Sequence, residues 1–150
     1  MRIFVSACLL GENCKYNGGN NYSEKTVAFI KRHEVVALCP EVAGGLPVPR
    51  ASAEIVDGIV KTKSGQSVDE EFRTGAEKVL AEVLKQKVEL AVLQSRSPSC
   101  GVKEIYDGSF SGKKIKGQGI FAKMLMDEGI KVIDVEDIEK CTMNAIPLTI

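Results

Sequence analysis

Three cysteines of this chain lie at or just after short apolar runs. Cys8 ends the run RIFVSAC, Cys39 lies near the end of EVVALCP, and Cys100 follows ELAVLQS in the serine-rich segment SRSPSCG. The segment after each run contains glycine or proline, which is typical of loops whose backbone approaches a ligand closely. If the runs are parallel strands of one sheet, we expect the three thiols to meet at its carboxyl edge.

Three thiolates at one point suit a soft metal centre, either zinc or an iron–sulfur cluster. Structural zinc normally has four ligands, often supplied as C-x-x-C pairs, but the sequence has no such pair and its one histidine, His33, lies at a charged helix end. A 4Fe-4S cluster held by three cysteines would leave one iron open to a substrate. Cysteines at strand ends also occur for packing alone; their presence in three equivalent loops favours a metal site.

The composition is that of an ordinary globular protein and narrows the possible partners. The 150 residues carry no net charge, 5% are aromatic and none is tryptophan, which gives no basis for binding a nucleic acid polymer. No apolar segment reaches the roughly 18–20 residues that span a bilayer, and RIFVSAC is more typical of a strand than of a signal peptide. The odd number of cysteines, five, argues against a disulfide framework. We therefore expect a cytoplasmic protein with no membrane or nucleic acid polymer partner.

Predicted strands and helices alternate along the chain. Nearly continuous apolar runs predict buried strands over 2–8, 34–40, 89–95 and 130–135. Apolar residues at spacings of three and four predict helices over 23–33, 68–87 and 117–129. This alternation predicts an α/β fold with a Rossmann-like, open, mostly parallel sheet of about four strands and helices on both faces.

The helix ends and one helix face can also be predicted. Ser23 is a plausible N-cap of the first helix, and Gly129 a C-cap of the last. In the first helix, Val27, Ala28 and Ile30 are expected to share the buried face.

Two Asp-Gly pairs predict turns outside this sheet. Asp57-Gly58 fits a small inserted β-hairpin before the long helix, and Asp107-Gly108 fits a hairpin or excursion before the last helix. Residues 1–137 are predicted to form a single α/β domain. Residues 138–150 lack clear periodicity and are predicted to be a C-terminal tail.

Four segments together carry a resemblance to a known family: SACLLGENCKYNGGN (6–20), LCPEVAGGLPVPR (38–50), SRSPSCG (95–101) and GQGIFAKML (117–125). By the order and separation of these segments, the chain resembles, from about Arg2 to Asp137, the bacterial domain-of-unknown-function 523 family, whose characterised members are thiouracil desulfidases. The combination is specific, although no single segment is.

The resemblance implies a Rossmann-like domain that binds a 4Fe-4S cluster and leaves one iron not ligated by protein. That iron would take the sulfur of a thiolated pyrimidine or a related small molecule. By motif position, the resemblance implies that Cys8, Cys39 and Cys100 are the ligands. Lys15 and Asn17 stand where the family usually shows arginine and aspartate, and lysine lacks the planar bidentate fork of arginine.

The same resemblance assigns the catalytic groups. Glu41 would be the acid and base, and a serine of SRSPSCG would assist; Ser97 and Ser99 both fit, with Ser97 favoured. Elementary chemistry agrees with these roles, because water activated by a carboxylate can attack a thiocarbonyl carbon and break the C–S bond without net redox change.

Other residues have two interpretations each. Cys14 could replace one ligand but is more typical of a loop or packing position, and Cys141 is expected to be a bystander. Arg50 and Arg96 could hold an anionic substrate group or anchor loops. The glycines of GQGIFA are expected to serve a tight turn and close packing, because the third glycine of a dinucleotide fingerprint is missing.

Two alternative functions stay open. The same three cysteines could serve a non-catalytic metal-binding or redox-sensing module. A metal-free enzyme with a cysteine nucleophile is less favoured, because His33 belongs to a different element and no other histidine can act as its base.

Overall fold

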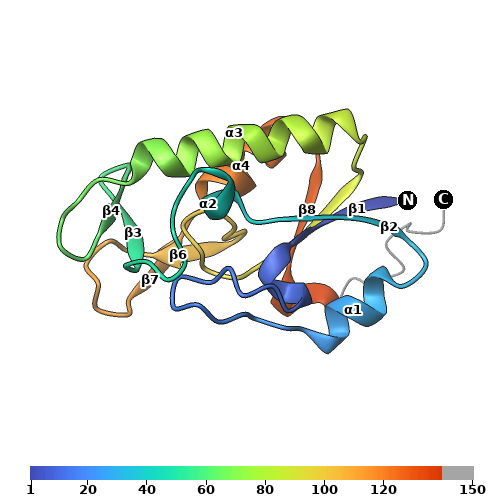
Figure 1. Cartoon of the computed structure of the whole chain (residues 1–150), viewed down its shortest axis with the longest axis horizontal. Helices are drawn as coiled ribbons and strands as arrows, with labels where there is room; N and C mark the ends of the chain where they lie inside the picture. The colour runs from blue at the N-terminus through green and yellow to red at the C-terminus, as the bar shows by residue number, and fades with distance from the viewer. Residues whose placement is uncertain (140–150) are drawn as a thin grey trace.

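The computed structural model describes residues 1–139 (Figure 1). Cys141 and most of the predicted tail lie outside the described residues. Ile138, which the sequence assigns to that tail, is buried and packs into the core. Among residues 1–139, no helix is long and apolar enough to cross a membrane.

A four-stranded parallel sheet forms the centre of the fold, as predicted. Its strands lie in the order β2 (Glu34–Leu38), β1 (Arg2–Ser6), β5 (Leu90–Leu93) and β8 (Lys131–Asp134). Ser6 pairs with Leu38, so β1 and β2 end level with each other. The segments that carry Cys8 and Cys39 therefore leave the sheet at the same edge.

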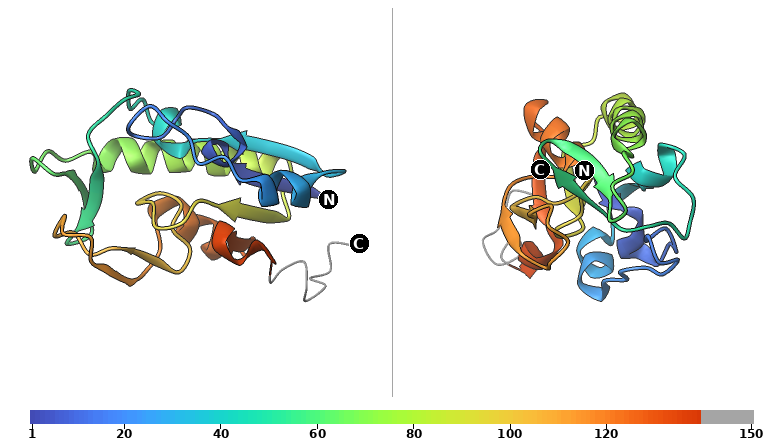
Figure 2. Two further views of the ribbon diagram at one scale, coloured as in Figure 1. Left: turned by 90° about the horizontal axis from the view of Figure 1, so that it is seen from below. Right: turned by 90° about the vertical axis from the view of Figure 1, so that its left-hand side faces the viewer.

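Helices cover both faces of the sheet (Figures 1 and 2). Because side chains alternate along a strand, Phe4 points to one face and its neighbours Ile3 and Val5 to the other. Phe4 packs in the core formed with α3 (Asp69–Lys85) and α4 (Ile120–Asp127), and its ring meets that of Phe121 edge to face at 5.2 Å. The α/β prediction is confirmed.

The first helix, α1 (Glu24–Ile30), covers the opposite face and corrects one prediction. Ser23 is its N-cap, as expected, and the Ser23 hydroxyl accepts the N–H of Thr26 at 3.1 Å. Thr26 is buried and Ile30 packs on the core, whereas Val27 and Ala28 are exposed. The predicted buried face was therefore wrong at Val27 and Ala28, because a seven-residue helix has too few turns to fix its own orientation.

Two hairpins lie beyond the sheet, at the left of Figure 1. The first joins β3 (Ala53–Val56) to β4 (Ile59–Thr62) through Asp57 and Gly58, both at positive φ as a type I′ turn requires. The second pairs β6 (Glu104–Tyr106) with β7 (Lys114–Lys116) across a longer loop. Both predicted hairpins are confirmed.

Three single-turn elements were not predicted: η1 (Ala7–Leu10), α2 (Pro40–Ala43) and η2 (Val135–Asp137). Each begins one or two residues after the end of a strand of the sheet, at the carboxyl edge. A single turn is too short to show a periodic apolar pattern. Two of these turns carry residues of the candidate site.

Asp69, the first residue of α3, joins that helix to the first hairpin. Its carboxylate accepts the N–H of Val60 at 3.0 Å and the Nε–H of Arg73 at 2.7 Å. Partial burial disfavours the charged form of Asp69, but hydrogen bonds from Arg73 and Val60 outweigh it and hold the pKa below its ordinary value.

Asp69→Asn is expected to lower the free energy of unfolding by about 1 kcal/mol at neutral pH. Because the pKa of Asp69 is lower in the folded state, the contribution of its charge is present above the unfolded pKa and is lost as pH falls through the folded value. Urea unfolding should therefore distinguish the two proteins at about pH 7 and bring them together at about pH 2. An equal difference at both pH values would contradict this account.

Candidate metal and catalytic site

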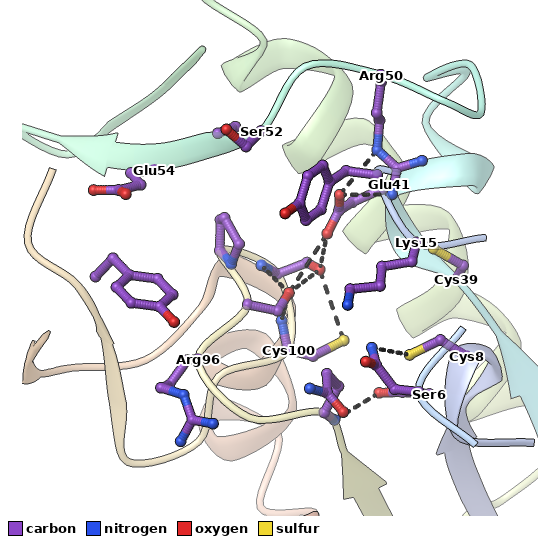
Figure 3. Close-up of a pocket in the computed structure, with 18 of the residues that line it drawn as sticks. Ser6, Cys8, Lys15, Cys39, Glu41, Arg50, Ser52, Glu54, Arg96 and Cys100 are labelled. Carbon is purple, nitrogen blue, oxygen red and sulfur yellow. Dashed lines mark hydrogen bonds and ion pairs between the residues drawn. The ribbon is translucent and has the colours of Figure 1, made fainter. Parts of the chain in front are cut away.

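A large pocket opens at the carboxyl edge of the sheet (Figure 3). It has a volume of about 630 Å³ and is bounded by the loops that follow β1, β2 and β5. The hairpin residues Glu54 and Tyr106 complete its outer wall. This is the position at which open α/β sheets bind their ligands.

The three strand-end cysteines all line this pocket, as expected. Cys8 lies in η1, Cys39 is the N-cap residue of α2, and Cys100 follows β5 and is buried. The structure thus brings together three residues that are far apart in the sequence.

Cys14 lies in the loop between η1 (Ala7–Leu10) and α1, as expected, and it also lines the pocket. Its thiol is in hydrogen-bonding contact with the sulfur atoms of both Cys39 and Cys8. Since a thiol has one hydrogen, Cys14 donates to one of them at a time.

These contacts lower the pKa values of Cys8 and Cys39 and raise that of Cys14. The hydrogen bond from Cys14 lowers the pKa of Cys39 to about 7 and also lowers that of Cys8, against the effect of burial. The pKa of Cys14 is raised, because its proton is held by Cys39 and Cys8. Cys14 thus stabilises as a thiolate whichever of the two it donates to, and the thiolate is the form in which cysteine binds a metal.

Further donors surround the other sulfur atoms. Burial raises the pKa of Cys100, although the Ser6 hydroxyl donates a hydrogen bond to its sulfur and Ser99 Oγ lies 3.7 Å from it. The Asn21 amide donates to Cys8 Sγ at 3.4 Å. Hydrogen bonds of this kind orient metal ligands and tune the centre that they hold.

The donor set fits an iron–sulfur cluster. Cys8, Cys14, Cys39 and Cys100 are free thiols on one pocket, and soft sulfur donors select iron–sulfur clusters or zinc. Among residues 1–139, no three His, Cys, Asp or Glu side chains are already arranged around one metal-ion position. In a 4Fe-4S cluster each cysteine binds a different iron, so its ligands need not meet at one point.

Glu41 lies in α2 and faces the same pocket (Figure 3). One carboxylate oxygen, Oε1, accepts Arg50 Nη2 at 2.9 Å and Arg50 Nε at 3.2 Å. The other, Oε2, accepts the Ser99 hydroxyl at 2.8 Å. Only 14% of the Glu41 side chain is exposed, so this carboxylate is largely withdrawn from bulk water.

The two candidate serines form a chain that ends at Glu41. Ser97 Oγ lies 2.9 Å from Ser99 Oγ and 3.5 Å from Glu41 Oε2. Ser97 Oγ also accepts the N–H groups of Ser99 and Cys100 at 3.0 Å, which leaves its own hydrogen free to donate to Ser99. The structure therefore makes Ser99, and not Ser97, the closer partner of Glu41.

Close backbone contacts fix the site against the helices. A Cβ on Gly75 of α3 would overlap the carbonyl oxygen of Pro40, between Cys39 and Glu41. A Cβ on Gly119, before α4, would lie 2.6 Å from the Ser99 carbonyl oxygen. The expectation that the glycines of GQGIFA serve close packing is confirmed for Gly119.

Comparison with known proteins identifies the family of this chain. The family described as 2-thiouracil desulfurase matches residues 3–137. The chain belongs to this family. The matched range contains all four pocket cysteines as well as Glu41, Arg50, Ser97 and Ser99.

Two family relatives are similar over nearly their whole length. The uncharacterized protein YbbK of Bacillus subtilis is 39% identical over 146 residues, covering 91% of this chain and 97% of YbbK. The solved structure of the [4Fe-4S]-dependent thiouracil desulfidase TudS is 39% identical, has a TM-score of 0.88 and covers 95% of this chain and 96% of TudS. The resemblance inferred from the four sequence segments is confirmed.

Ser6 completes the site and was not predicted from the sequence, whereas the places of Lys15 and Arg96 can now be compared with expectation. Ser6 is the one buried polar residue of β1 and stands at its carboxyl end, and this was the signal that could have drawn attention to it. Lys15 extends between Cys8, Cys39 and Cys100 in Figure 3. Arg96 lines the pocket, but its guanidinium pairs with Glu136 at 2.9 Å, so it anchors a loop.

Proposed function

We propose that this protein is a 4Fe-4S-dependent desulfidase that replaces the sulfur of a thiolated pyrimidine, or of a related small molecule, with oxygen from water. One observation carries the proposal: a pocket of thiols lies beside a buried carboxylate with its own chain of serines, in a member of the 2-thiouracil desulfurase family. The reducing cytoplasm would keep these thiols available.

Cys8, Cys39 and Cys100 would hold the cluster, and Cys14 would remain a thiol beside them. When bound with one iron not ligated by protein, the cluster supplies a Lewis-acidic position for a soft thiocarbonyl sulfur. The protein then has to activate water, move its proton and exclude bulk solvent.

Glu41 is the base that takes a proton from the attacking water. Its Oε1 is occupied by Arg50, so Oε2 is the oxygen that accepts the proton. Ser97, which is half-buried, and Ser99, which is buried, link the pocket to Oε2 and would relay the proton. Water attacks the thiocarbonyl carbon, the C–S bond breaks, and sulfur leaves as sulfide, so no net oxidation or reduction occurs.

Sulfide release tests this function directly. Protein reconstituted anaerobically with iron and sulfide, then freed of excess reagent, should convert 2-thiouracil or another thiolated pyrimidine to the oxygen analogue and release one sulfide per molecule converted. Protein that takes up iron and releases sulfide from none of a panel of thiolated bases and nucleosides would show the proposal to be wrong.

The ligand assignment predicts which cysteines are needed for iron. Cys8→Ala, Cys39→Ala and Cys100→Ala are each expected to lose most of the bound iron, because each removes one thiolate from the cluster. Cys14→Ala is expected to keep it, with at most the 10–100-fold loss of metal affinity typical of a neighbouring donor.

Iron and acid-labile sulfide per chain, with the visible absorption spectrum, measure the outcome. Ser67→Ala, at an exposed position away from the pocket, is the control. If Cys14→Ala loses its iron and Cys100→Ala retains it, Cys14 takes the place of Cys100 in the ligand set.

A further inference from the structure

Arg50 is an enclosed cation of the pocket, with 8% of its side chain exposed. The sequence left two roles open for it, binding an anionic group of the substrate or anchoring a loop. Its contacts decide between them.

The guanidinium of Arg50 is almost fully engaged by the protein itself. Nε and Nη2 both donate to Glu41 Oε1, Nη2 also donates to the carbonyl oxygen of Cys14 at 2.9 Å, and Nη1 donates to that of Pro47 at 3.2 Å. These bonds use four of the five N–H groups of an arginine. Little capacity remains for an anionic group of the substrate.

The backbone of Arg50 also contacts the loop that contains Cys14. Its N–H donates to the carbonyl oxygen of Tyr16 at 2.7 Å. Arg50 therefore holds the loop with Cys14 and Tyr16 against the turn that carries Glu41, so the carboxylate and the Cys14 thiol share one anchor.

We infer that Arg50 is a positioning residue that fixes the Glu41 carboxylate for proton transfer. Its two donors saturate Oε1 and leave Oε2 directed at Ser99, so only one oxygen of Glu41 is available to the reaction. A planar fork with several donors can do this, whereas the point charge of lysine cannot reach all the acceptors at once. This inference rests on the proposed function, because it assigns how Glu41 is held during that reaction.

Arg50→Ala is expected to lower kcat by about 100-fold, as a displacement of about 1 Å in a reacting group can do, with KM changed less than about threefold. Arg50→Lys keeps the charge but loses the fork, and kcat is expected to lie between those of Arg50→Ala and the wild type. Iron content of both variants is expected to match that of the wild type. Arg73→Ala removes an arginine that pairs with a carboxylate outside the pocket, and it is the matched control.

Chemical rescue separates positioning from a purely structural role. Guanidinium ions, added below the concentrations that unfold the protein, should restore part of kcat to Arg50→Ala by filling the space beside Glu41. They should not raise kcat of the wild type, Arg50→Lys or Arg73→Ala.

Three results overturn the inference alone, provided that the wild type releases sulfide. The first is an unchanged kcat in Arg50→Ala. The second is a rise in KM of Arg50→Ala at constant kcat, which would make Arg50 a substrate-binding residue. The third is loss of iron from both Arg50→Ala and Arg50→Lys. A wild type that holds iron and releases no sulfide overturns the proposed function and the inference together.

Discussion

Glu41→Gln is expected to lower kcat for sulfide release by about 10²–10⁴-fold, the usual contribution of a general base. Glutamine has nearly the same shape, and its amide oxygen can still accept the two N–H groups of Arg50. It cannot accept a proton at the position of Oε2, which lies 2.8 Å from the Ser99 hydroxyl. The variant should therefore keep its cluster and lose most of its sulfide release.

The control for Glu41→Gln is Asp69→Asn, because Asp69 also pairs with an arginine but lies outside the pocket. It should release sulfide at the wild-type rate. Iron and sulfide content and the absorption spectrum of both variants should match those of the wild type. If Glu41→Gln keeps kcat within about threefold of the wild type, Glu41 is not the base. If it loses its cluster instead, Glu41 serves the metal centre and not the proton transfer.

The sheet could be predicted because a strand that is buried on both faces is a nearly continuous apolar run in the sequence. The strands β1, β2, β5 and β8 coincide with the four apolar runs to within a few residues at each end. Once the strands are parallel, their carboxyl ends must lie at one edge, which is why Cys8, Cys39 and Cys100 could be placed together before the structure was known.

The remainder of the site depends on loop paths that carry no periodic signal. Cys14 reaches Cys8 and Cys39 because its loop folds back on itself, with Gly18 N–H bonded to the Lys15 carbonyl and Gly18 in the left-handed region. Arg50 approaches Glu41 through the turn and irregular chain of residues 44–49, which follow α2. Neither contact follows from the residue types or their spacing.

The choice between Ser97 and Ser99 also depends on the path of a loop, which the sequence does not reveal. Both serines lie in one short loop, and the resemblance to the family favoured Ser97. The direction of each hydroxyl is set by the turn, in which Ser97 Oγ accepts the N–H groups of Ser99 and Cys100. Ser99 is thereby left to donate to Glu41, so the two serines form one hydrogen-bonded chain that ends at Glu41.

The contact between α2 and α3 places both Cys39 and Glu41, and it depends on the absence of two side chains. Gly75 of α3 lies against the carbonyl of Pro40, and Gly44 lies against the carbonyl of Glu71. These carbonyl groups belong to backbone, so they cannot move aside as the end of a flexible side chain could. A methyl group at either glycine must push α2 away from α3.

Gly75→Ala is therefore expected to destabilise the protein although it improves helix propensity. Alanine favours a helix by about 1 kcal/mol over glycine, whereas overpacking of this kind costs about 1–3 kcal/mol and sometimes more. At the upper end of that range the net loss is about 2 kcal/mol, which corresponds to a fall in Tm of about 4–8 °C for a chain of this size. Displacement of α2 by about 1 Å should also lower kcat by about 100-fold, since Glu41 moves with it.

Thermal unfolding of the metal-free protein, iron uptake and sulfide release measure these effects separately. Thr74→Ala changes the adjacent, exposed position of α3 and should leave all three unchanged or slightly raise Tm. Gly44→Ala introduces its methyl group from the other side of the same contact and should reproduce the loss. Since Cys39 and Glu41 flank Pro40, iron uptake and kcat should fall together in both glycine variants. If Gly75→Ala is as stable and as active as Thr74→Ala, then the approach of α2 to α3 does not hold these two residues in place.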